Sequence, residues 1–478
     1  MANIFFYNNT LRCLLFFIGL ACLSITGFGQ NKNTKPINTP QSIAAPLIVP
    51  DTSKTNLLLP VRDTGKNNIG GYLTLQQCID YAMLHQPGLN IAQIKVDVAK
   101  TTNAIDLAGA LPQINASGNL IHYLQLSPVN GSIKGQTIVN TFVPGVSVTQ
   151  AIFSNSLLYA YRSAPLYVKQ AQQATDSTKI FLVSSVSKSF YTLLLTLEQI
   201  NVLKEDTAEF AKSLRDAYHQ YKGGIVDETD YEQAEITLNN TLAQLKQANE
   251  NVVPQYAALK KLMGFPAEKQ FNVVFDTLEM MKSIHIDTAE QLQYEKRIEL
   301  QQIKTSKDLQ NEQINFYRYD FLPTVSAFYN YNLNYDSSTL GGLFSTSNPS
   351  SFIGLSFNIP IFTGFARLHN IRKAKLLGQI LDWDETDIKA GIYAEYTSAL
   401  ANYKGNYFNL QTLQKNVELS KRVYFVVSLQ YRQGVVPYLN VITAESNLIT
   451  SEINYLNALF SVLSNKIDLE KAMGDISY

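Results

Sequence analysis

Polar and apolar residues alternate along two stretches in the second half of the chain. Between 325 and 335 the odd positions carry aliphatic or tyrosine side chains, and the even positions carry serine or asparagine, except at Phe328. The stretch 353–359 shows the same split. Because successive side chains of a strand point to opposite faces of a sheet, this pattern predicts strands with one apolar and one neutral polar face. We expect strands at about 322–336 and 351–361, and a fainter pair at about 111–126 and 138–151.

The two predicted strand pairs belong to a sequence that is repeated once, at an offset of about 210 residues. The LPQI segment at 111–114 matches LPTV at 322–325, and the YKGG segment at 221–224 matches YRQG at 431–434. Further matches in the same order are Gly145 with Gly354, Ala234-Glu235 with Ala444-Glu445, and Met263-Gly264 with Met473-Gly474. We therefore expect two copies of one unit, at 73–265 and 287–478, joined by a linker at 266–286.

Each copy has the same predicted order: a helix, two strands, a very long helix and a returning helix. In the first copy the helices are expected over Leu73–Ala110, Asn155–Lys222 and Val226–Met263. The long helix would span about 100 Å. Apolar residues on the returning helix recur at steps of three and four, which indicates coiled-coil packing. The predicted fold class is therefore a mixed α/β protein built from a duplicated unit.

Residues 1–29 have the pattern of a secretory signal peptide. Arg12 precedes the apolar stretch 14–25, and small residues lead to an expected cut after Gly29. That stretch is shorter than the about 20 residues that a membrane helix needs, so we expect cleavage rather than an anchor. Lipidation at Cys22 is the alternative. Residues 30–72, rich in Asn, Thr and Pro, are predicted to be a flexible tether.

Charge is balanced overall but absent from the predicted strands. The chain has 39 Lys and Arg against 39 Asp and Glu, which removes the electrostatic case for nucleic acid binding. The stretch 107–161 holds one charged residue, Lys134, and 321–366 holds one, Asp336, each expected in a loop. Strands with a neutral polar face and a tyrosine-rich apolar face favour a membrane sheet with lipid outside and water inside. A soluble sheet packed on the helices is the alternative.

Counting strands then predicts an oligomer. Four strands per chain cannot close a barrel, and the eight strands of two chains would fill the lumen with side chains. Three chains give twelve strands, the smallest closed assembly of this unit with room for a water-filled bore.

This duplicated order in an exported protein resembles the TolC family of outer-membrane efflux ducts. The residues that carry the resemblance are the LPQI and LPTV junctions, the segment 354–364 with Pro360 at the strand-to-helix turn, the two Tyr-x-x-Gly segments and the closing Met473-Gly474. The resemblance covers about 73–478. It implies a homotrimer whose twelve-stranded barrel contacts lipid in the outer membrane of a Gram-negative bacterium. A helical tunnel would continue the barrel into the periplasm, where its tip docks on an adaptor of an inner-membrane transporter.

The resemblance also implies two sets of site residues. The adaptor-docking tips are Tyr221, Gly224 and Ile225 in the first copy and Tyr431, Gly434 and Val435 in the second. A Tyr-x-x-Gly segment is equally a simple helix cap and turn. Family members narrow the periplasmic gate with acidic residues. Here Asn440 and Thr443 are neutral, which leaves Asp230 to form a single acidic ring, or only to stabilise a helix N-terminus.

Catalytic chemistry is not indicated by any motif. The five histidines are scattered, and Cys78 is the only cysteine after the signal peptide. The sequence lacks a phosphate-binding glycine loop and a nucleophile elbow. We therefore expect no enzyme, cofactor or metal, and passive conduction driven by a partner. Protein secretion through the same duct and a periplasmic coiled-coil scaffold are the alternatives, and the sequence does not indicate the substrate.

Overall fold

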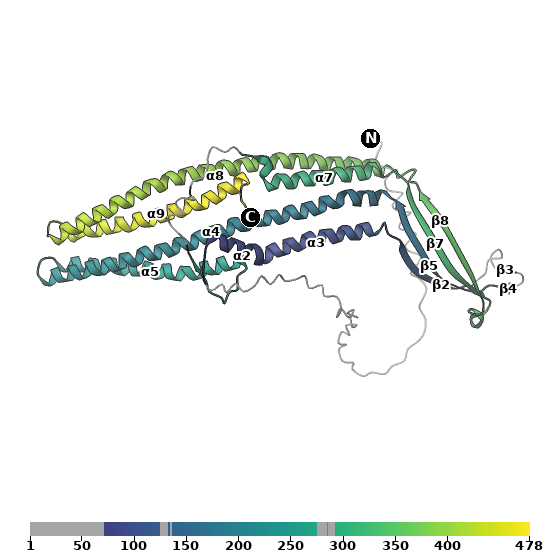
Figure 1. Ribbon diagram of the computed structural model, residues 1–478, viewed down its shortest axis with the longest axis horizontal. Coiled ribbons are helices and arrows are strands. Elements are labelled where there is room, and N and C mark those ends of the chain that lie inside the picture. The colour runs from purple at the N-terminus through teal and green to yellow at the C-terminus, as the bar shows by residue number, and fades with distance from the viewer. Residues whose placement is uncertain (1–70, 125–131, 134–135, 275–283, 285–291) are drawn as a thin grey trace, which may run out of the picture. The chain divides into compact units, whose positions relative to one another are not determined.

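The computed structural model describes residues 71–124, 132–133, 136–274, 284 and 292–478. The expected signal peptide and almost all of the expected tether lie outside these residues, as does Lys134. The described part is mostly helical, with one larger sheet (Figure 1). Its strands are β1 (Tyr72–Leu73), β2 (Gln113–His122), β3 (Ser132–Ile133), β4 (Gln136–Thr137), β5 (Asn140–Phe153), β6 (Asn272–Val273), β7 (Thr324–Ser337) and β8 (Ser347–Asn358). Its helices are α2 (Leu75–His85), α3 (Pro87–Ala108), α4 (Asn155–Lys222), α5 (Glu228–Met263), α7 (Ile298–Arg318), α8 (Ala366–Arg432) and α9 (Tyr438–Met473).

The first expected helix is in fact two helices. Gln86 has extended backbone angles, φ −69° and ψ 119°, and separates α2 from α3. Proline has no amide hydrogen, so Pro87 cannot continue the helix before it but fits the first position of the next. The Gln86 side chain accepts a hydrogen bond from the Leu89 amide at 2.7 Å and caps α3. A single helix over Leu73–Ala110 was therefore the wrong prediction.

The larger sheet is antiparallel, in the order β2-β5-β7-β8. Its register places Ile114, Val148, Tyr329 and Ile353 in one row across all four strands. The adjacent row is Asn115, Ser147, Asn330 and Phe352. Because neighbouring rows point to opposite faces, the apolar and the mainly polar sets are separated as the alternation predicts. Asp336 corrects one detail: it lies in β7, paired with Thr141, and not in a loop.

Phe328, the residue that breaks the alternation, has a specific place on the polar face. It pairs with Gly354, where an added Cβ would lie 2.6 Å from the Cζ atom of Phe328. Gly145 likewise leaves space for the Asn332 side chain, because a Cβ added at Gly145 would lie 2.1 Å from the Oδ1 atom of Asn332. The matched glycines of the two copies therefore both lie under large side chains of β7.

The main hydrophobic core lies where α5 and α9 end, far from the turns that join α4 to α5 and α8 to α9. It joins buried residues of α2, α4, α5, α8 and α9, among them Leu194, Leu259 and Leu463. The expected linker also takes part, because β6 pairs in parallel with β1 and Phe271 and Ile284 are buried there. Within the described residues, α4 is the one helix with a segment long and apolar enough to cross a membrane, and half of that segment is buried in the protein.

Candidate docking tips and periplasmic gate

The first hairpin (α4 and α5) and the second hairpin (α8 and α9) end in the same glycine turn. Gly224 and Gly434 are left-handed, with φ of 70° and 71°. In the first hairpin the Gly224 amide donates to the Tyr221 carbonyl at 2.9 Å, and the Ile225 amide donates to the Gln220 carbonyl at 2.9 Å. The second hairpin repeats both bonds, from Gly434 to Tyr431 and from Val435 to Gln430, at 2.9 Å each. Both turns are Schellman motifs, which satisfy the last carbonyls of a helix.

Each turn presents one exposed aliphatic side chain. Ile225 is 70% exposed and Val435 is 69% exposed. A Schellman motif usually packs the residue at this position back onto its own helix. The exposure of both residues therefore leaves an apolar contact available at each tip.

The two tip tyrosines have different environments. Tyr221 is half-buried, and its ring lies 5.1 Å from that of Tyr231. Tyr431 is only 6% exposed, its ring lies 5.1 Å from that of Tyr438, and its hydroxyl has no hydrogen-bond partner. In this conformation Tyr431 therefore packs the tip from inside and is not accessible to a partner, although the family resemblance implies a docking role for it.

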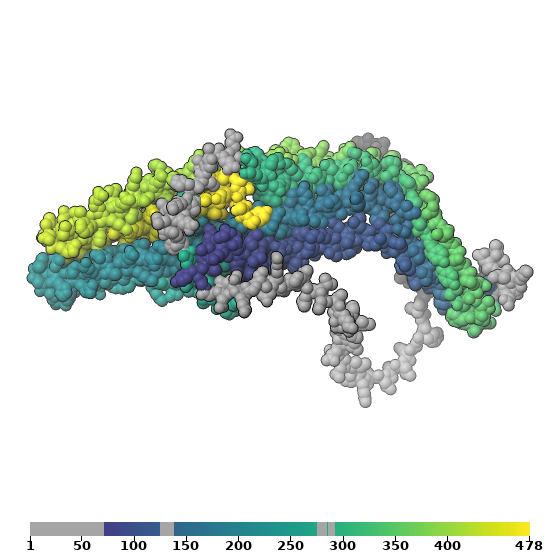
Figure 2. Space-filling view, viewed as in Figure 1, coloured from purple at the N-terminus to yellow at the C-terminus, as the bar shows by residue number. Residues whose placement is uncertain are grey.

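An apolar cluster joins the two hairpins near their turns. Its buried members are Ala217 of α4, Ala234 of α5, Tyr431 of α8, and Tyr438 and Val441 of α9. The space-filling view shows the ends of the two hairpins in contact (Figure 2). The tips of the two sequence copies therefore form one continuous end of the molecule.

The proposed gate residues lie in the first two turns of the returning helices. Asp230 is half-exposed in the first turn of α5, where its negative charge interacts favourably with the positive end of the helix dipole. Burial and the neighbouring Asp227 raise its pKa. Burial, followed by the charges of Asp230 and Asp216, raises the pKa of Tyr431 to about 12, so the structure brings Asp230 of one hairpin close to Tyr431 of the other.

Asn440 and Thr443 occupy the matching part of the second hairpin. Both are exposed at the start of α9. The Thr443 hydroxyl donates to the Leu439 carbonyl of its own helix at 2.9 Å. The second hairpin therefore places neutral side chains where the first places a carboxylate.

Pro360 marks the difference between the two strand-to-helix connections. In the first copy β5 passes into α4 through Ser154, whose hydroxyl accepts the Leu157 amide. In the second copy the connection runs from 359 to 365 and ends with Gly364 and Phe365, both at positive φ. Gln150, which stands where the second copy has Pro360, lies within β5 and donates to the Ala110 carbonyl at 3.3 Å.

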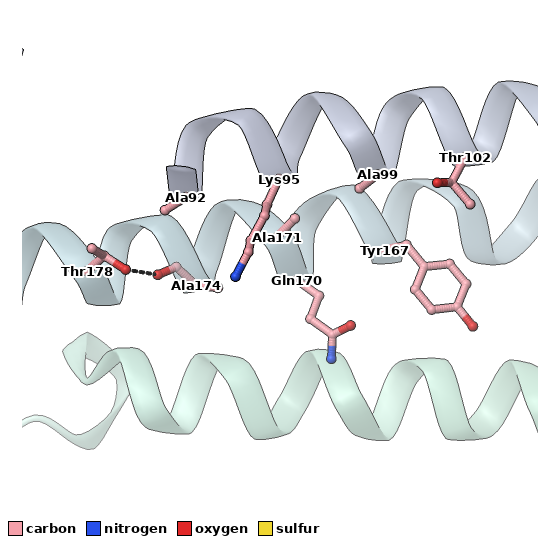
Figure 3. Close-up of a pocket in the computed structure, with 9 residues that line it drawn as sticks. All are labelled: Ala92, Lys95, Ala99, Thr102, Tyr167, Gln170, Ala171, Ala174 and Thr178. Carbon is pink, nitrogen blue, oxygen red and sulfur yellow. Dashed lines mark hydrogen bonds between the residues drawn. The ribbon is translucent and has the colours of Figure 1, made fainter. Parts of the chain in front are cut away.

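A groove between α3 and α4 has a volume of about 390 Å³ (Figure 3). Small side chains create it: Ala92 and Ala99 face Ala171 and Ala174. Lys95 is the one charged residue in its lining, and the Thr178 hydroxyl is bonded to the Ala174 carbonyl of its own helix. No group of three or more His, Cys, Asp or Glu in the described part of the chain is placed to hold a metal ion. The groove is a gap in helix packing and carries no acid–base pair.

Comparison with known proteins identifies the family. Residues 78–265 and 291–475 match the family described as outer membrane efflux protein. The probable efflux pump outer membrane protein TtgC of Pseudomonas putida is 22% identical over 84% of this chain and 82% of its own length. The cation efflux system protein CusC of Escherichia coli is 23% identical over 83% of this chain and 85% of its own length.

Solved structures share the fold. A crystal structure of CusC has a TM-score of 0.70 at 20% identity and covers 84% of this chain and 91% of its own. VceC of Vibrio cholerae has a TM-score of 0.69 at 15% identity and covers 84% of this chain and 96% of its own. Since the family match includes both copies of the repeat, the chain belongs to the outer membrane efflux protein family and is an efflux channel of the outer membrane.

Proposed function

We propose that three copies of this chain form the outer-membrane duct of a tripartite efflux system. The duct conducts small molecules passively after an inner-membrane pump has delivered them through a periplasmic adaptor. The single observation that carries this proposal is the four-stranded sheet, which ends in two unpaired edge strands, β2 and β8.

The direction of the strands supports closure between copies. Neighbouring strands of the sheet are antiparallel, so β2 and β8 run in opposite directions. The β8 edge of one copy can therefore pair with the β2 edge of the next as another antiparallel ladder. All ten residues of β2 are exposed. An exposed edge of this length is a site for pairing with another chain, and closing a barrel removes it. Three copies of this four-stranded sheet give twelve strands.

The two faces of the sheet support a membrane location for the strands. The apolar face carries exposed Leu120, Tyr329, Leu355 and Phe357. The other face carries mainly asparagine and serine. β2, β5, β7 and β8 have 10, 14, 14 and 12 residues. A strand tilted across a bilayer needs about 9–11 residues. We propose that the apolar face meets lipid and the neutral face lines the bore.

The tips support a docking role. Ile225 and Val435 offer exposed aliphatic contacts on turns that the glycines fix in position. Relatives are named for an antibiotic efflux pump, a toluene efflux pump and a cation efflux system, so the substrate class differs among them. A bore lined by asparagine and serine has little chemical selectivity. We propose that the pump, and not this duct, selects the substrate.

Two measurements test this function. Native mass spectrometry after mild detergent extraction should give the mass of three copies, and a monomer or dimer would contradict the barrel. Photo-crosslinking in the native host from positions 225 and 435 should capture a periplasmic adaptor. Val253, which is 68% exposed on α5 away from the turn, is the matched control position. Capture of an ATP-driven protein exporter would favour secretion, and a profile equal to that of Val253 would contradict docking at the tips.

A further inference from the structure

The duplicated Ala-Glu dipeptide has opposite environments in the two copies. Glu235 on α5 is exposed, whereas its counterpart Glu445 on α9 is 0% exposed. The preceding alanines, Ala234 and Ala444, are buried in both copies. The difference therefore concerns the carboxylate alone and cannot be read from the local sequence.

Glu445 is buried, and neither of its carboxylate oxygens has a hydrogen bond of normal geometry. The Ser213 hydroxyl of α4 is close enough to favour the charged form, but it lies 3.1 Å from the Tyr438 hydroxyl of α9 and pairs with that group. Among the described residues, no Lys or Arg forms an ion pair with Glu445. An ionised carboxylate in such a place is costly, and a carboxyl group there takes up a proton instead.

The charged groups around Glu445 are mainly acidic. From α4 it faces Asp206, which is only 8% exposed, and Glu209. From α8 it faces Tyr424, whose hydroxyl donates to Glu209 at 3.5 Å. Lys421 of α8, the cation that acts on Asp206, is bound to Glu452 of α9 at 2.9 Å.

This arrangement accounts for how strongly the group binds a proton. Burial raises the pKa of Glu445 to about 7, the Ser213 hydroxyl lowers it, and the charges of Glu209 and Asp206 raise it further. Burial, followed by Glu452 and Glu205, also raises the pKa of Asp206 to about 7, while Lys421 lowers it.

We propose that Glu445 is a proton-binding site between α4, α8 and α9, and that this interface near the tips stays closed while the proton is bound and loosens when it is lost. Because the hydrated carboxylate is ionised well below neutral pH, rising pH favours conformations in which water reaches Glu445. The part of the inference that concerns transport rests on the proposed function: the periplasmic end of the duct should open more easily at alkaline than at acidic pH.

The test measures local opening on the full-length purified protein. Hydrogen–deuterium exchange gives protection factors for the amides of 440–450, with the intrinsic pH dependence of exchange divided out. For one carboxyl whose pKa falls from about 7 to its ordinary value on opening, protection should drop by up to about 30-fold between pH 5.5 and 8. In Glu445→Gln this contribution should be lost, and the drop should shrink to the part that the neighbouring Asp206 contributes. Glu445→Leu should behave in the same way, which would show that the effect comes from loss of the carboxylate and not from the side-chain amide of glutamine.

Three further variants and conditions complete the test. Glu235→Gln removes the exposed counterpart and should leave the full pH dependence. Asp206→Asn removes a neighbouring acidic charge and should move the transition to lower pH. A pH dependence unchanged in both Glu445 variants would overturn the proposal. A transition that follows K⁺ or Na⁺ concentration at fixed pH would also overturn it, in favour of a cation site. Exchange reports on the helices themselves, so a failed conductance assay beside a normal exchange result would count against the duct and not against the proton site.

Discussion

Gly224 and Gly434, which lie in different copies of the repeat, have the same left-handed backbone, with φ of 70° and 71°. At both positions the space around an added Cβ is open, with nothing within 4 Å. The requirement for glycine is therefore conformational and not steric. Left-handed backbone costs an L-residue about 1–2 kcal/mol.

Alanine at a tip should destabilise the second hairpin by that amount. We expect Gly434→Ala to cost about 1–2 kcal/mol and to lower the midpoint of thermal unfolding in detergent. Gly405→Ala is the matched control, because Gly405 lies within α8 and also has open space around an added Cβ. There alanine should stabilise the helix by about 1 kcal/mol. Equal effects of the two substitutions would contradict the role assigned to the turn.

The contact of Gly354 with Phe328 should limit assembly of the sheet. In Gly354→Ala the new methyl group meets the Phe328 ring, and the yield of heat-resistant oligomer on a gel should fall. Combining it with Phe328→Leu should restore the yield, because the ring is the obstacle. Gly118→Ala is the control on β2, where an added Cβ has its nearest neighbour at an ordinary 3.5 Å. Failure of the double variant to recover would show that another contact is responsible.

Arg297 should be a large contributor to stability outside the tips. Its buried guanidinium bonds Glu299, the Glu395 carboxylate at 2.6 Å and the Ala472 carbonyl at 2.9 Å, which ties α7 to α8 and to the end of α9. Arg297→Met removes these hydrogen bonds, although Glu395 keeps Lys471 at 3.2 Å, and should cost about 1.5–3 kcal/mol. Lys296→Met, which removes a partly exposed pair with Asp475, should cost less than about 1 kcal/mol. Calorimetry in detergent distinguishes the two.

The same network predicts a dependence on pH. Burial acts to raise the pKa of Glu395, but the hydrogen bond and charge of Arg297 bring it below its ordinary value of 4.5. The folded state then binds the proton more weakly than the unfolded state. Its contribution to stability is present above about pH 4.5 and is lost as the pH falls below that value. In Arg297→Met this acid-dependent part of the melting curve should shrink, because only Lys471 then opposes the effect of burial on Glu395.

Asp230 should determine cation preference at the closed end of the duct. Asp230→Asn should lower single-channel cation preference and weaken block by divalent cations, and Asn440→Asp should strengthen both. Because the pKa of Asp230 is raised, block should weaken on acidification at a higher pH than an ordinary aspartate would give. If Asp230→Asn leaves conductance and block unchanged, Asp230 serves only the N-terminus of α5.

Patterns that depend on local chemistry were predictable from the sequence. The alternation in β7 gave its faces, because each row of the sheet follows the period of the strand. The glycine turns were predictable because Gly224 and Gly434 end long helical stretches. The break at Gln86 was missed, although Pro87 carried the signal.

Tertiary packing was not predictable from one sequence. Tyr221 and Tyr431 have the same local motif, yet only Tyr431 is buried, because it belongs to the apolar cluster that joins the two hairpins. Glu235 and Glu445 differ for the same reason. In both pairs, the packing of helices from the two copies determines which member is enclosed.

The pairing of β5 with β7 joins the two copies by the same antiparallel geometry that joins the strands within each copy. A single copy therefore already has the two edges required for ring formation, and six unfused copies could close the same ring with sixfold symmetry. In the proposed ring of three chains, fusing them in pairs would preserve the geometry of the ring but lower its symmetry to threefold. Neighbouring units are then free to evolve apart, so an exposed glutamate and a buried one can alternate around the same circle.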